Sequence, residues 1–351
     1  MSKKHILAAV ILTITGIVIG FGLDYYIVHK KNNVSEEKVI YIYKDYSYSQ
    51  MIDTICLSGA LKNSKSFVKA AKRKELKNKF KAGRYSLKKG MGNNQIIATI
   101  AFAWQSPMQL TFRGYSSSVE SLAYVFGKRF EADSAEFIQY LGDTKISDSL
   151  GFDRANFIGM FIPNTYEFYW TASPMEVISR FKREYDTFWT DERKAKAKSI
   201  SMSPQEVITL ASIVVSESNY APEQPRIAGV YINRLKKGIK LQADPTVRFV
   251  AIQKEPDLKR ILHRHLKINS PYNTYIHRGL PPGPIIIPSM SAINAVLNYE
   301  KNSYIYFCAK PTFDGTHNFT SSYSKHLKNA RAYSKALNKR LKEEAVKNAN
   351  M

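Results

Sequence analysis

The residue best placed for acid–base chemistry is Glu217, a carboxylate that closes the apolar run LASIVVSES at residues 210–218. Ahead of it, Ser203-Pro204-Gln205-Glu206 predicts a helix start, with a serine N-cap, a proline at the first position and a capping-box glutamate. A helical wheel places Glu217 on the apolar flank of this helix and in its last turn. The wheel gives a polar side of Thr209, Ser212 and Ser216 and an apolar side of Val207, Leu210, Ala211 and Val214.

Both features of this position disfavour the charged form of Glu217. An apolar flank removes water from the carboxylate, and the negative end of the helix dipole repels it, so the pKa of Glu217 should rise. A glutamic acid that is protonated near neutral pH is what a general acid for glycoside cleavage requires. The pattern is equally compatible with a partly exposed glutamate at a fraying helix end, and both interpretations stay open at this point.

The residues after this helix predict a cleft. Residues 222–238 form a second amphipathic helix closed by Gly238. Asp244-Pro245-Thr246 has the order of a further N-cap followed by proline, which makes helix capping the plain interpretation of Asp244. The loop at 270–289 is rich in proline and glycine, and rigid loops with polar side chains are where binding sites concentrate.

The composition predicts a globular chain with an anionic partner. Its 351 residues suffice for two or three domains, and 44% of them are hydrophobic. Lysine and arginine outnumber aspartate and glutamate by 52 to 29, which gives a net charge of +23. Such a charge suits nucleic acid, a phospholipid surface or an acidic polymer such as a bacterial cell wall. The basic residues form no stripe with interleaved aromatics, so nucleic acid is only weakly indicated.

The N-terminus predicts a membrane anchor. Residues Ile6–Leu23 are apolar or small throughout, which is about the length of a membrane helix. Two lysines precede this run and favour a cytoplasmic N-terminus, and no small-residue cleavage site follows it, although a signal peptide would give the same compartment. We therefore expect residues 1–28 to form a single-pass anchor in the cytoplasmic (inner) membrane of a bacterium. The bulk of the chain then lies on the periplasmic side, which argues against nucleic acid as the partner.

The remaining chain predicts an α+β fold in two parts. A polar linker at 29–38 leads to a small module at 39–104, and residues 105–345 form a larger α+β domain. The module should contain strands at 39–44 and 83–91 and helices at 47–61, 64–76 and 93–103, the last capped by Asn93. The larger domain should contain a core strand and turn at 159–170, a long helix at 173–199 and a solvated basic helix from Ala332.

The cysteine and histidine residues predict no metal site. Cys56 and Cys308 lie far apart and are expected to be two buried thiols, with a single disulfide as the alternative. His263 and His265 have no nearby third ligand. We therefore assign no metal and no cofactor.

Four ordered motifs resemble the endolytic murein transglycosylases, a family of membrane-anchored enzymes that cut nascent peptidoglycan strands. The motifs are LASIVVSES (210–218), VYINRLKKGIKLQADPTV (230–247), SPYNTYIHRGLPPGPI (270–285) and GTHNFTSSYSKH (315–326). In addition, AGRYSLKKGM (82–91) resembles the end of the family's N-terminal LysM-like subdomain, and FIPNTYEF (161–168) resembles a further family segment. The resemblance implies a transmembrane helix, a LysM-like subdomain at 39–104 and a catalytic transglycosylase domain at 105–345.

The resemblance also implies site residues. Glu217 matches the catalytic glutamate of the family, and His317 matches a motif residue to which we assign no role. The positions expected to bind substrate are Asn233, Arg234, Gln242, Asp244, Tyr272, Asn273, Thr274, Gly279, Leu280, Pro281, Pro282 and Gly283. The chain departs from the family at Val215 and Asn164, where acidic residues are common, and at Ser218, where threonine is common.

The implied reaction cleaves the β-1,4 bond between N-acetylmuramic acid and N-acetylglucosamine and leaves a 1,6-anhydro end. Such a lyase can work with one carboxyl group, here Glu217, whereas most glycoside hydrolases need two. Two alternatives stay open: a muramidase that pairs Glu217 with Asp244, and a membrane-anchored scaffold that binds the wall without cleaving it. Peptidoglycan strands, the lipid bilayer and cell-wall synthases are the candidate partners, and internal cleavage is expected from the resemblance alone.

Overall fold

The structure is a computed structural model that describes residues 2–349 and divides into two compact units. Unit 1 comprises the chain up to Leu110 together with Arg129–Ala132 and Tyr166–Ser173. Unit 2 comprises Thr111–Lys128, Asp133–Thr165 and the residues from Pro174 onward. Both units combine helices with small two-stranded sheets, which confirms the predicted α+β class.

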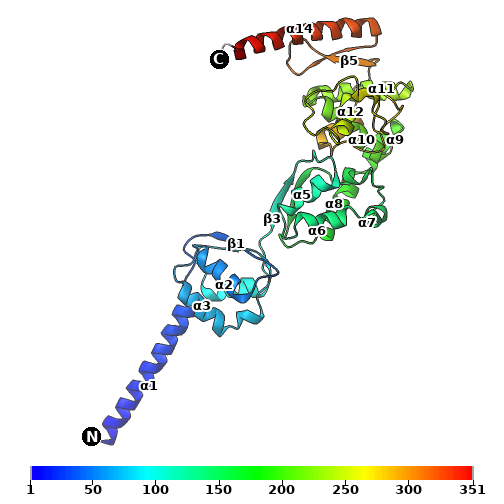
Figure 1. Cartoon of the computed structure of the whole chain (residues 1–351). Helices are drawn as coiled ribbons and strands as arrows, with labels where there is room; N and C mark the ends of the chain where they lie inside the picture. Colours follow the sequence, from blue (N-terminus) through cyan, green and yellow to red (C-terminus); the bar gives the residue numbers. More distant parts are fainter. Residues whose placement is uncertain (1, 350–351) are drawn as a thin grey trace. The chain divides into compact units, whose positions relative to one another are not determined.

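Unit 1 begins with the predicted apolar helix. Helix α1 (Lys3–Tyr25) continues directly into a π-helical segment, Tyr26–Lys30, and leads into the small module (Figure 1). The helix Lys3–Lys30 has a mean hydropathy of 2.6 in its most apolar part and none of that part is buried, so it is long and apolar enough to cross a membrane. By length and composition, a signal sequence passes the same test.

The segment predicted as a linker, 29–38, packs into unit 1. His29, Asn33 and Val34 are buried, and the Asn94 side chain lies 3.0 Å from His29 Nδ1. The expected capping role of Asn93 is wrong: Gly92 occupies the N-cap of helix α4 (Asn93–Ala101). The buried Asn93 amide instead donates to the Val28 carbonyl at 2.7 Å, because this backbone oxygen needs a partner where water is excluded.

The core of unit 1 lies between one antiparallel sheet and three helices. Strand β1 (Lys38–Ile42) pairs with β2 (Gly83–Leu87) so that Lys38 faces Leu87. The predicted helices are present as α2 (Tyr48–Leu57), capped by Ser47, α3 (Ser64–Arg73) with a 3₁₀ turn at Leu76–Asn78, and α4. Their apolar faces meet in one cluster that includes Ile40, Ile42, Met51, Ile55, Phe67, Tyr85, Leu87 and Ile96.

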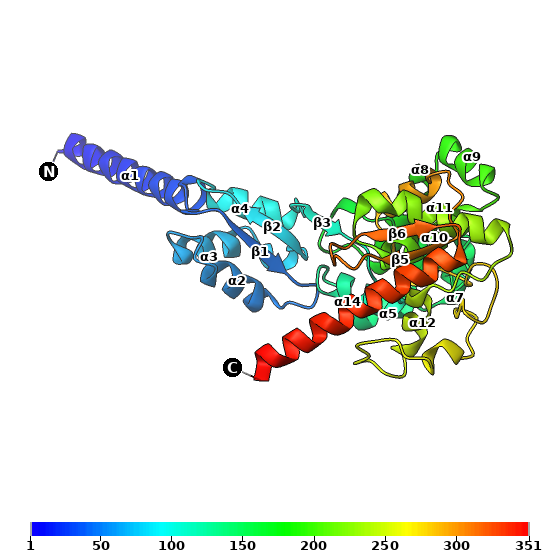
Figure 2. The same cartoon turned by 90° about the horizontal axis from the view of Figure 1, so that it is seen from above.

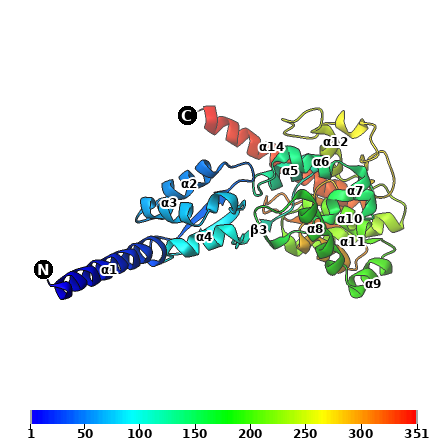
Figure 3. The same ribbon diagram turned by 90° about the horizontal axis from the view of Figure 1, so that it is seen from below.

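The elements from β3 to α8 come before the Glu217-bearing helix in the sequence. Strands β3 (Met108–Phe112) and β4 (Asn164–Phe168) form a two-stranded sheet. Strand β4 lies within the core strand and turn predicted at 159–170, and the 3₁₀ segment Phe157–Met160 precedes it. Helices α5 (Val119–Gly127), α6 (Ser134–Leu141), α7 (Thr144–Ser149) and α8 (Pro174–Phe188) follow in unit 2, where α5 and α6 pack together (Figure 3). Phenylalanines of these helices pack at tilted angles against one another and against Phe161, in a cluster that includes Phe126, Phe137 and Phe181.

The single long helix expected at 173–199 is two helices. Helix α8 ends at Phe188, and α9 (Asp191–Ser199) begins after Thr190, whose side chain accepts a hydrogen bond from the Arg193 backbone N–H. Trp189 is 2% exposed, so the chain turns around a buried indole at this point. The buried Trp189 thus marks the end of α8, and the Thr190 N-cap starts α9.

Helix α10 (Pro204–Glu217) is the central helix of unit 2 and begins with the predicted Ser203 capping box. It packs against α11 (Gln224–Lys236), α12 (Asp244–Ala251) and α13 (Met290–Leu297). Of the predicted polar side, Ser216 is exposed, whereas Thr209 and Ser212 are buried together with the rest of 207–215. The Ser212 hydroxyl there donates to the Thr209 carbonyl at 2.7 Å and accepts from the Ile285 N–H at 3.1 Å. A central helix can carry small hydroxyls when each finds a backbone partner.

The C-terminal elements lie over this helical core. Strand β5 (Tyr306–Ala309) pairs with β6 (His317–Thr320), and helix α14 (Tyr323–Ala349) runs alongside both strands (Figure 2). The basic helix expected from Ala332 therefore begins nine residues earlier, and its side chains from Ala332 to Glu344 are exposed or partly exposed. Cys308 on β5 and Cys56 on α2 are both free thiols, as predicted, but they are only partly buried and not buried as expected.

Candidate functional site

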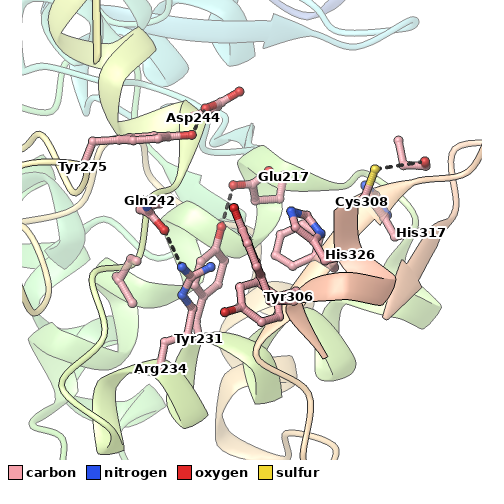
Figure 4. Close-up of a pocket in the computed structure, with 14 residues that line it drawn as sticks. Glu217, Tyr231, Arg234, Gln242, Asp244, Tyr275, Tyr306, Cys308, His317 and His326 are labelled. Carbon is pink, nitrogen blue, oxygen red and sulfur yellow. Dashed lines mark hydrogen bonds between the residues drawn. The ribbon is translucent and has the colours of Figure 1, made fainter. Parts of the chain in front are cut away.

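A cavity of ≈ 480 Å³ opens at the C-terminal end of α10 (Figure 4). Its walls come from α10, α11, the start of α12, the loop after it, the β5–β6 sheet and the first turns of α14. The lining residues that bear polar groups are Glu217, Tyr231, Arg234, Gln242, Asp244, Tyr275, Tyr306, Cys308, His317, Tyr323 and His326. Segments that are more than 100 residues apart in the sequence thus meet around one carboxyl group.

The Glu217 carboxyl group is held by a buried tyrosine. The Tyr231 hydroxyl, on α11, donates to Glu217 Oε1 at 2.6 Å (Figure 4). Because Oε1 accepts this hydrogen bond, the acidic proton of a protonated Glu217 lies on Oε2. Glu217 itself is only partly buried, and it lines the cavity. Its free oxygen can therefore reach a ligand there.

The surroundings of Glu217 raise its pKa to about 7. Loss of water is the largest cause, and the negative charge of Asp244 acts in the same direction. The Tyr231 hydrogen bond opposes both, because it stabilises the carboxylate. The pKa moves in the direction expected from the sequence, and it lies where a group can both give and take a proton at neutral pH.

Asp244 is the second carboxyl group of the cavity. Its expected role as N-cap is wrong, because Ala243 occupies the N-cap of α12 and Asp244 begins the helix. Its carboxylate instead accepts a hydrogen bond from the Tyr275 hydroxyl at 2.6 Å, as Figure 4 shows. A carboxylate that is not used for capping remains available to the cavity, where its charge acts on Glu217.

Arg234 and Gln242 form a further wall. The Arg234 guanidinium donates to Gln242 Oε1 at 2.6 Å and lies 5.7 Å from the centre of the Tyr306 ring. Only 7% of Arg234 is exposed, and burial lowers the pKa of its guanidinium. Gln242 has a positive φ of 48°, an unfavourable backbone conformation for this residue type. Such strain often accompanies a functional arrangement, and the Gln242 residue that bonds to Arg234 carries it.

The other predicted binding residues have partners of their own. The Asn233 amide donates to the carbonyls of Asn302 and Tyr304, and the Asn273 amide donates to those of Leu266 and Ile268. The Thr274 hydroxyl accepts from the Ala243 N–H at 3.0 Å and so ties the loop to the start of α12. These three side chains order the backbone behind the cavity, and their contact with substrate stays a prediction.

Tyr272 and the loop at 279–283 lie at a different place from the main cavity. Tyr272 packs against Phe249 at 4.9 Å and lines a separate hollow with Ser117 and Arg154. Gly283 can only be glycine, because a Cβ would lie 2.1 Å from the Ala155 carbonyl oxygen. The loop thus approaches the backbone closely, and substrate contact by Gly279, Leu280, Pro281, Pro282 and Gly283 stays a prediction.

His317, which received no role from the sequence, is held by a buried glutamate. Its backbone N–H donates to Glu223 Oε1 at 3.0 Å, and its Nδ1 lies 2.8 Å from Glu223 Oε2. Glu223 is 7% exposed and belongs to the 3₁₀ turn Ala221–Glu223 that follows α10. The pair fixes β6 to the end of the glutamate-bearing segment and presents the His317 ring to the cavity.

Sequence reasoning missed Tyr231, Tyr275, Tyr306, Tyr323 and His326. One signal was available for Tyr231, because it is three residues before Arg234 and therefore shares its face of α11. The other four reach the cavity from a loop, a strand and a helix whose positions only the fold determines. His326 stacks on Tyr306 at 5.1 Å, and burial lowers the pKa of its imidazole, so this ring contributes a neutral surface.

The arrangement is that of an acid–base site. One carboxyl group with a pKa of about 7 faces a cavity, and a second carboxylate, from another helix, lines the same cavity. Such a group can protonate a leaving oxygen and then, as a carboxylate, accept a proton from another hydroxyl. The geometry thus defines the class of site found in enzymes that cleave glycosidic bonds with carboxyl groups.

Comparisons with known proteins agree with this class. The model of the YceG-like family matches residues 40–332. An endolytic murein transglycosylase of Bacillus subtilis is 30% identical over 308 residues, which cover 84% of each chain. One from Streptococcus pneumoniae is 31% identical over 134 residues, which cover 38% of this chain and 24% of that protein. A crystal structure of a yceG-like protein from Listeria monocytogenes shares the fold, with a TM-score of 0.56 and 24% identity over 84% of this chain and 98% of that one.

The chain belongs to the YceG-like family, a family of lytic enzymes. This confirms the resemblance that the four sequence motifs indicated.

Proposed function

We propose that the protein is an endolytic peptidoglycan transglycosylase in which Glu217 is the single general acid and base. The observation that carries this proposal is the Glu217 carboxyl group itself. Its pKa is about 7, Tyr231 occupies its Oε1, and the group lines a cavity large enough for sugar residues. The names of the curated relatives support the reaction type and the substrate class.

The first step is proton transfer to the leaving sugar. Glu217 Oε2 donates its proton to the glycosidic oxygen between N-acetylmuramic acid and N-acetylglucosamine, and the bond from C1 to this oxygen breaks. N-Acetylglucosamine leaves with a free 4-hydroxyl, and Glu217 becomes a carboxylate. The Tyr231 hydroxyl at 2.6 Å stabilises this charge as it forms.

The second step closes a ring within the muramic acid. The C6 hydroxyl attacks C1, the new C6–O–C1 bond forms, and the hydroxyl proton passes to the Glu217 carboxylate. This restores the acid and leaves a 1,6-anhydro end without consuming water. An intramolecular nucleophile explains why one carboxyl group suffices. The negative charge of Asp244 favours the positive charge that develops at C1 between the two steps, and Arg234 and Gln242 position the sugar.

A hydrolase is the second candidate, and one observation favours it. Asp244 lines the same cavity as Glu217, and its charge reaches the Glu217 carboxyl group. In a muramidase Asp244 would act together with Glu217, and water would take the place of the C6 hydroxyl. The products differ, because hydrolysis leaves a reducing end and the lyase leaves an anhydro end.

The deciding experiment identifies the products by mass spectrometry. Full-length protein in detergent is incubated with uncross-linked peptidoglycan strands, and the released muropeptides are analysed for anhydro and reducing ends. We expect anhydro ends from the wild type and from Glu192→Gln, which alters an exposed glutamate on α9, and none from Glu217→Gln. Reducing ends would establish the hydrolase, and no release by any variant would favour a wall-binding scaffold.

The location follows from the apolar helix and the substrate. We propose that α1 anchors the chain in the cytoplasmic membrane with both units on the outer side, where peptidoglycan is assembled. The small α+β module of unit 1 is then the LysM-like subdomain, and the charge of +23 suits an anionic wall and membrane surface. Cell-wall synthases are the protein partners that this location makes available.

A further inference from the structure

A second cavity, of ≈ 490 Å³, adjoins the first at Glu217. The two share Glu217, Ala309 and His317, so a ligand that occupies one can extend into the other. The second cavity lies between the end of α10, the β5–β6 turn and α14. The residues of its lining that bear on a ligand are Lys310, Phe313, Tyr333 and Arg340.

Among the charged side chains that line this second cavity, cations outnumber carboxyl groups. Lys310 and Arg340 line it, and within the described chain Glu217 is the one carboxyl group among its lining residues. The nearby carboxylate of Asp314 accepts hydrogen bonds from Thr312 and from Thr316, which lower its pKa to about 2. Asp314 therefore stays ionised, and the charge of Lys310 contributes to its lowered pKa. The cations among the residues that line the cavity are Lys310 and Arg340.

Arg340 is held in place for binding. Its Nε donates to Glu344 Oε1 at 2.9 Å, and its guanidinium lies 5.2 Å from the centre of the Phe313 ring. Tyr333, two turns earlier on α14, packs against the same ring at 5.7 Å. Because Glu344 bonds to Nε, the two terminal amino groups of the guanidinium are left to bind a planar anion such as a carboxylate.

A third cavity, on another side of Glu217, is lined mainly by apolar side chains. It has a volume of ≈ 400 Å³ and shares Glu217 and Asp244 with the main cavity. Its other lining residues are mostly apolar, among them Ile252, Ile261 and Ile285, and include one cation, Arg248. A strand that passes Glu217 would therefore meet a largely apolar surface with one cation in one direction and a polar surface with two cations in the other. Such a difference distinguishes the two directions of the strand.

We infer that Arg340 and Lys310 bind a carboxylate of the peptide stem carried by muramic acid. The inference rests on the proposed function and names a part of its substrate. The N-acetylated sugars of a peptidoglycan strand are uncharged, so its negative charge lies on the carboxylates of the peptide stems. A cationic pocket beside the cleavage site therefore selects strands that carry stems and sets their direction at Glu217.

The test compares two strands that differ only in charge. Phosphate-free strands are used as prepared or after a carbodiimide and ammonia convert their carboxyl groups to amides. We expect Arg340→Gln to raise KM about fivefold on the charged strands and to leave kcat unchanged, because one charge-assisted contact is lost outside the reacting centre. On the amidated strands the variant and the wild type should have the same raised KM. Lys339→Gln, which alters the exposed neighbouring cation on α14, is the matched control.

Binding is measured in parallel with fluorescent strands, so that the result does not depend on cleavage. A fivefold rise of Kd for Arg340→Gln on charged strands alone supports the inference even if the proposed reaction proves wrong. Equal losses on charged and amidated strands, an equal effect of Lys339→Gln, or a wild type that does not distinguish the two strands would each overturn it.

Discussion

The end of α10 and the start of α12 present two carboxyl groups with the same hydrogen bond and different surroundings. Glu217 accepts from Tyr231 and Asp244 accepts from Tyr275, each at 2.6 Å. Glu217 is partly buried at the negative end of its helix, whereas Asp244 is exposed at the positive end of its own. The tyrosine does not decide the chemistry of the carboxyl group. Loss of water does, because it is the largest cause of the raised pKa of Glu217, and it suits Glu217 to carry a proton.

Removing each carboxyl group in turn tests this comparison most strongly. Glu217→Gln should lower kcat by about 10³-fold, because both proton transfers lose their carrier. Asp244→Asn should lower kcat by about 10- to 100-fold, because it removes only a stabilising charge. Turnover of uncross-linked strands measures both, with circular dichroism as a check on folding. Equal losses would mean that the two groups act as a pair, as in a hydrolase.

Asp244→Asn should also change the pH dependence. The Asp244 charge raises the pKa of Glu217, so its removal lowers that pKa. Glu217 must be protonated for the first step, so the alkaline limb of kcat/KM should move to lower pH. A limb that stays in place would show that another group controls it.

Tyr231→Phe should move the same limb in the opposite direction. The lost hydroxyl stabilises the Glu217 carboxylate, so without it the pKa of Glu217 rises and activity extends to higher pH. At the pH optimum kcat should fall about tenfold, because the carboxylate formed in the first step loses one charge-assisted hydrogen bond. Tyr231 is fully packed, so a thermal unfolding measurement is needed to separate this effect from instability. A shift to lower pH would contradict the assigned direction of the hydrogen bond.

Much of the fold was predictable from local signals. The Ser203 and Ser47 capping boxes fix the starts of α10 and α2, and the apolar periodicity gives the helices of both units. The break at Thr190 was missed because a threonine N-cap inside a charged, helix-favouring run is a weak signal beside the burial of Trp189. Tertiary packing therefore determines where α8 ends and α9 begins.

The candidate site was predictable only where a residue stood out within its own element. Glu217 did so, since it is an acid on an apolar helix flank. For Asp244 the sequence left two roles open, helix capping and substrate binding. In the structure Ala243 is the N-cap, because the hydroxyls of Thr274 and Thr246 hydrogen-bond to its backbone N–H and carbonyl. Arg340 belongs to a tail that was expected to be solvated, and His326 ends the fourth motif. Only the packing of α14 on β5 and β6 brings them to the cavities.

The smallest effect should come from Tyr275→Phe, the counterpart of the tyrosine change at Glu217. Its hydroxyl bonds to an exposed carboxylate, where water replaces a lost donor at little cost. We expect kcat to fall by no more than about threefold, because Asp244 keeps its charge. The alkaline limb should stay close to its wild-type position, since the charge that acts on Glu217 is unchanged. A loss as large as that of Tyr231→Phe would mean that the Tyr275 hydroxyl touches the substrate itself, and a pH profile of both variants on the same strands decides between these outcomes.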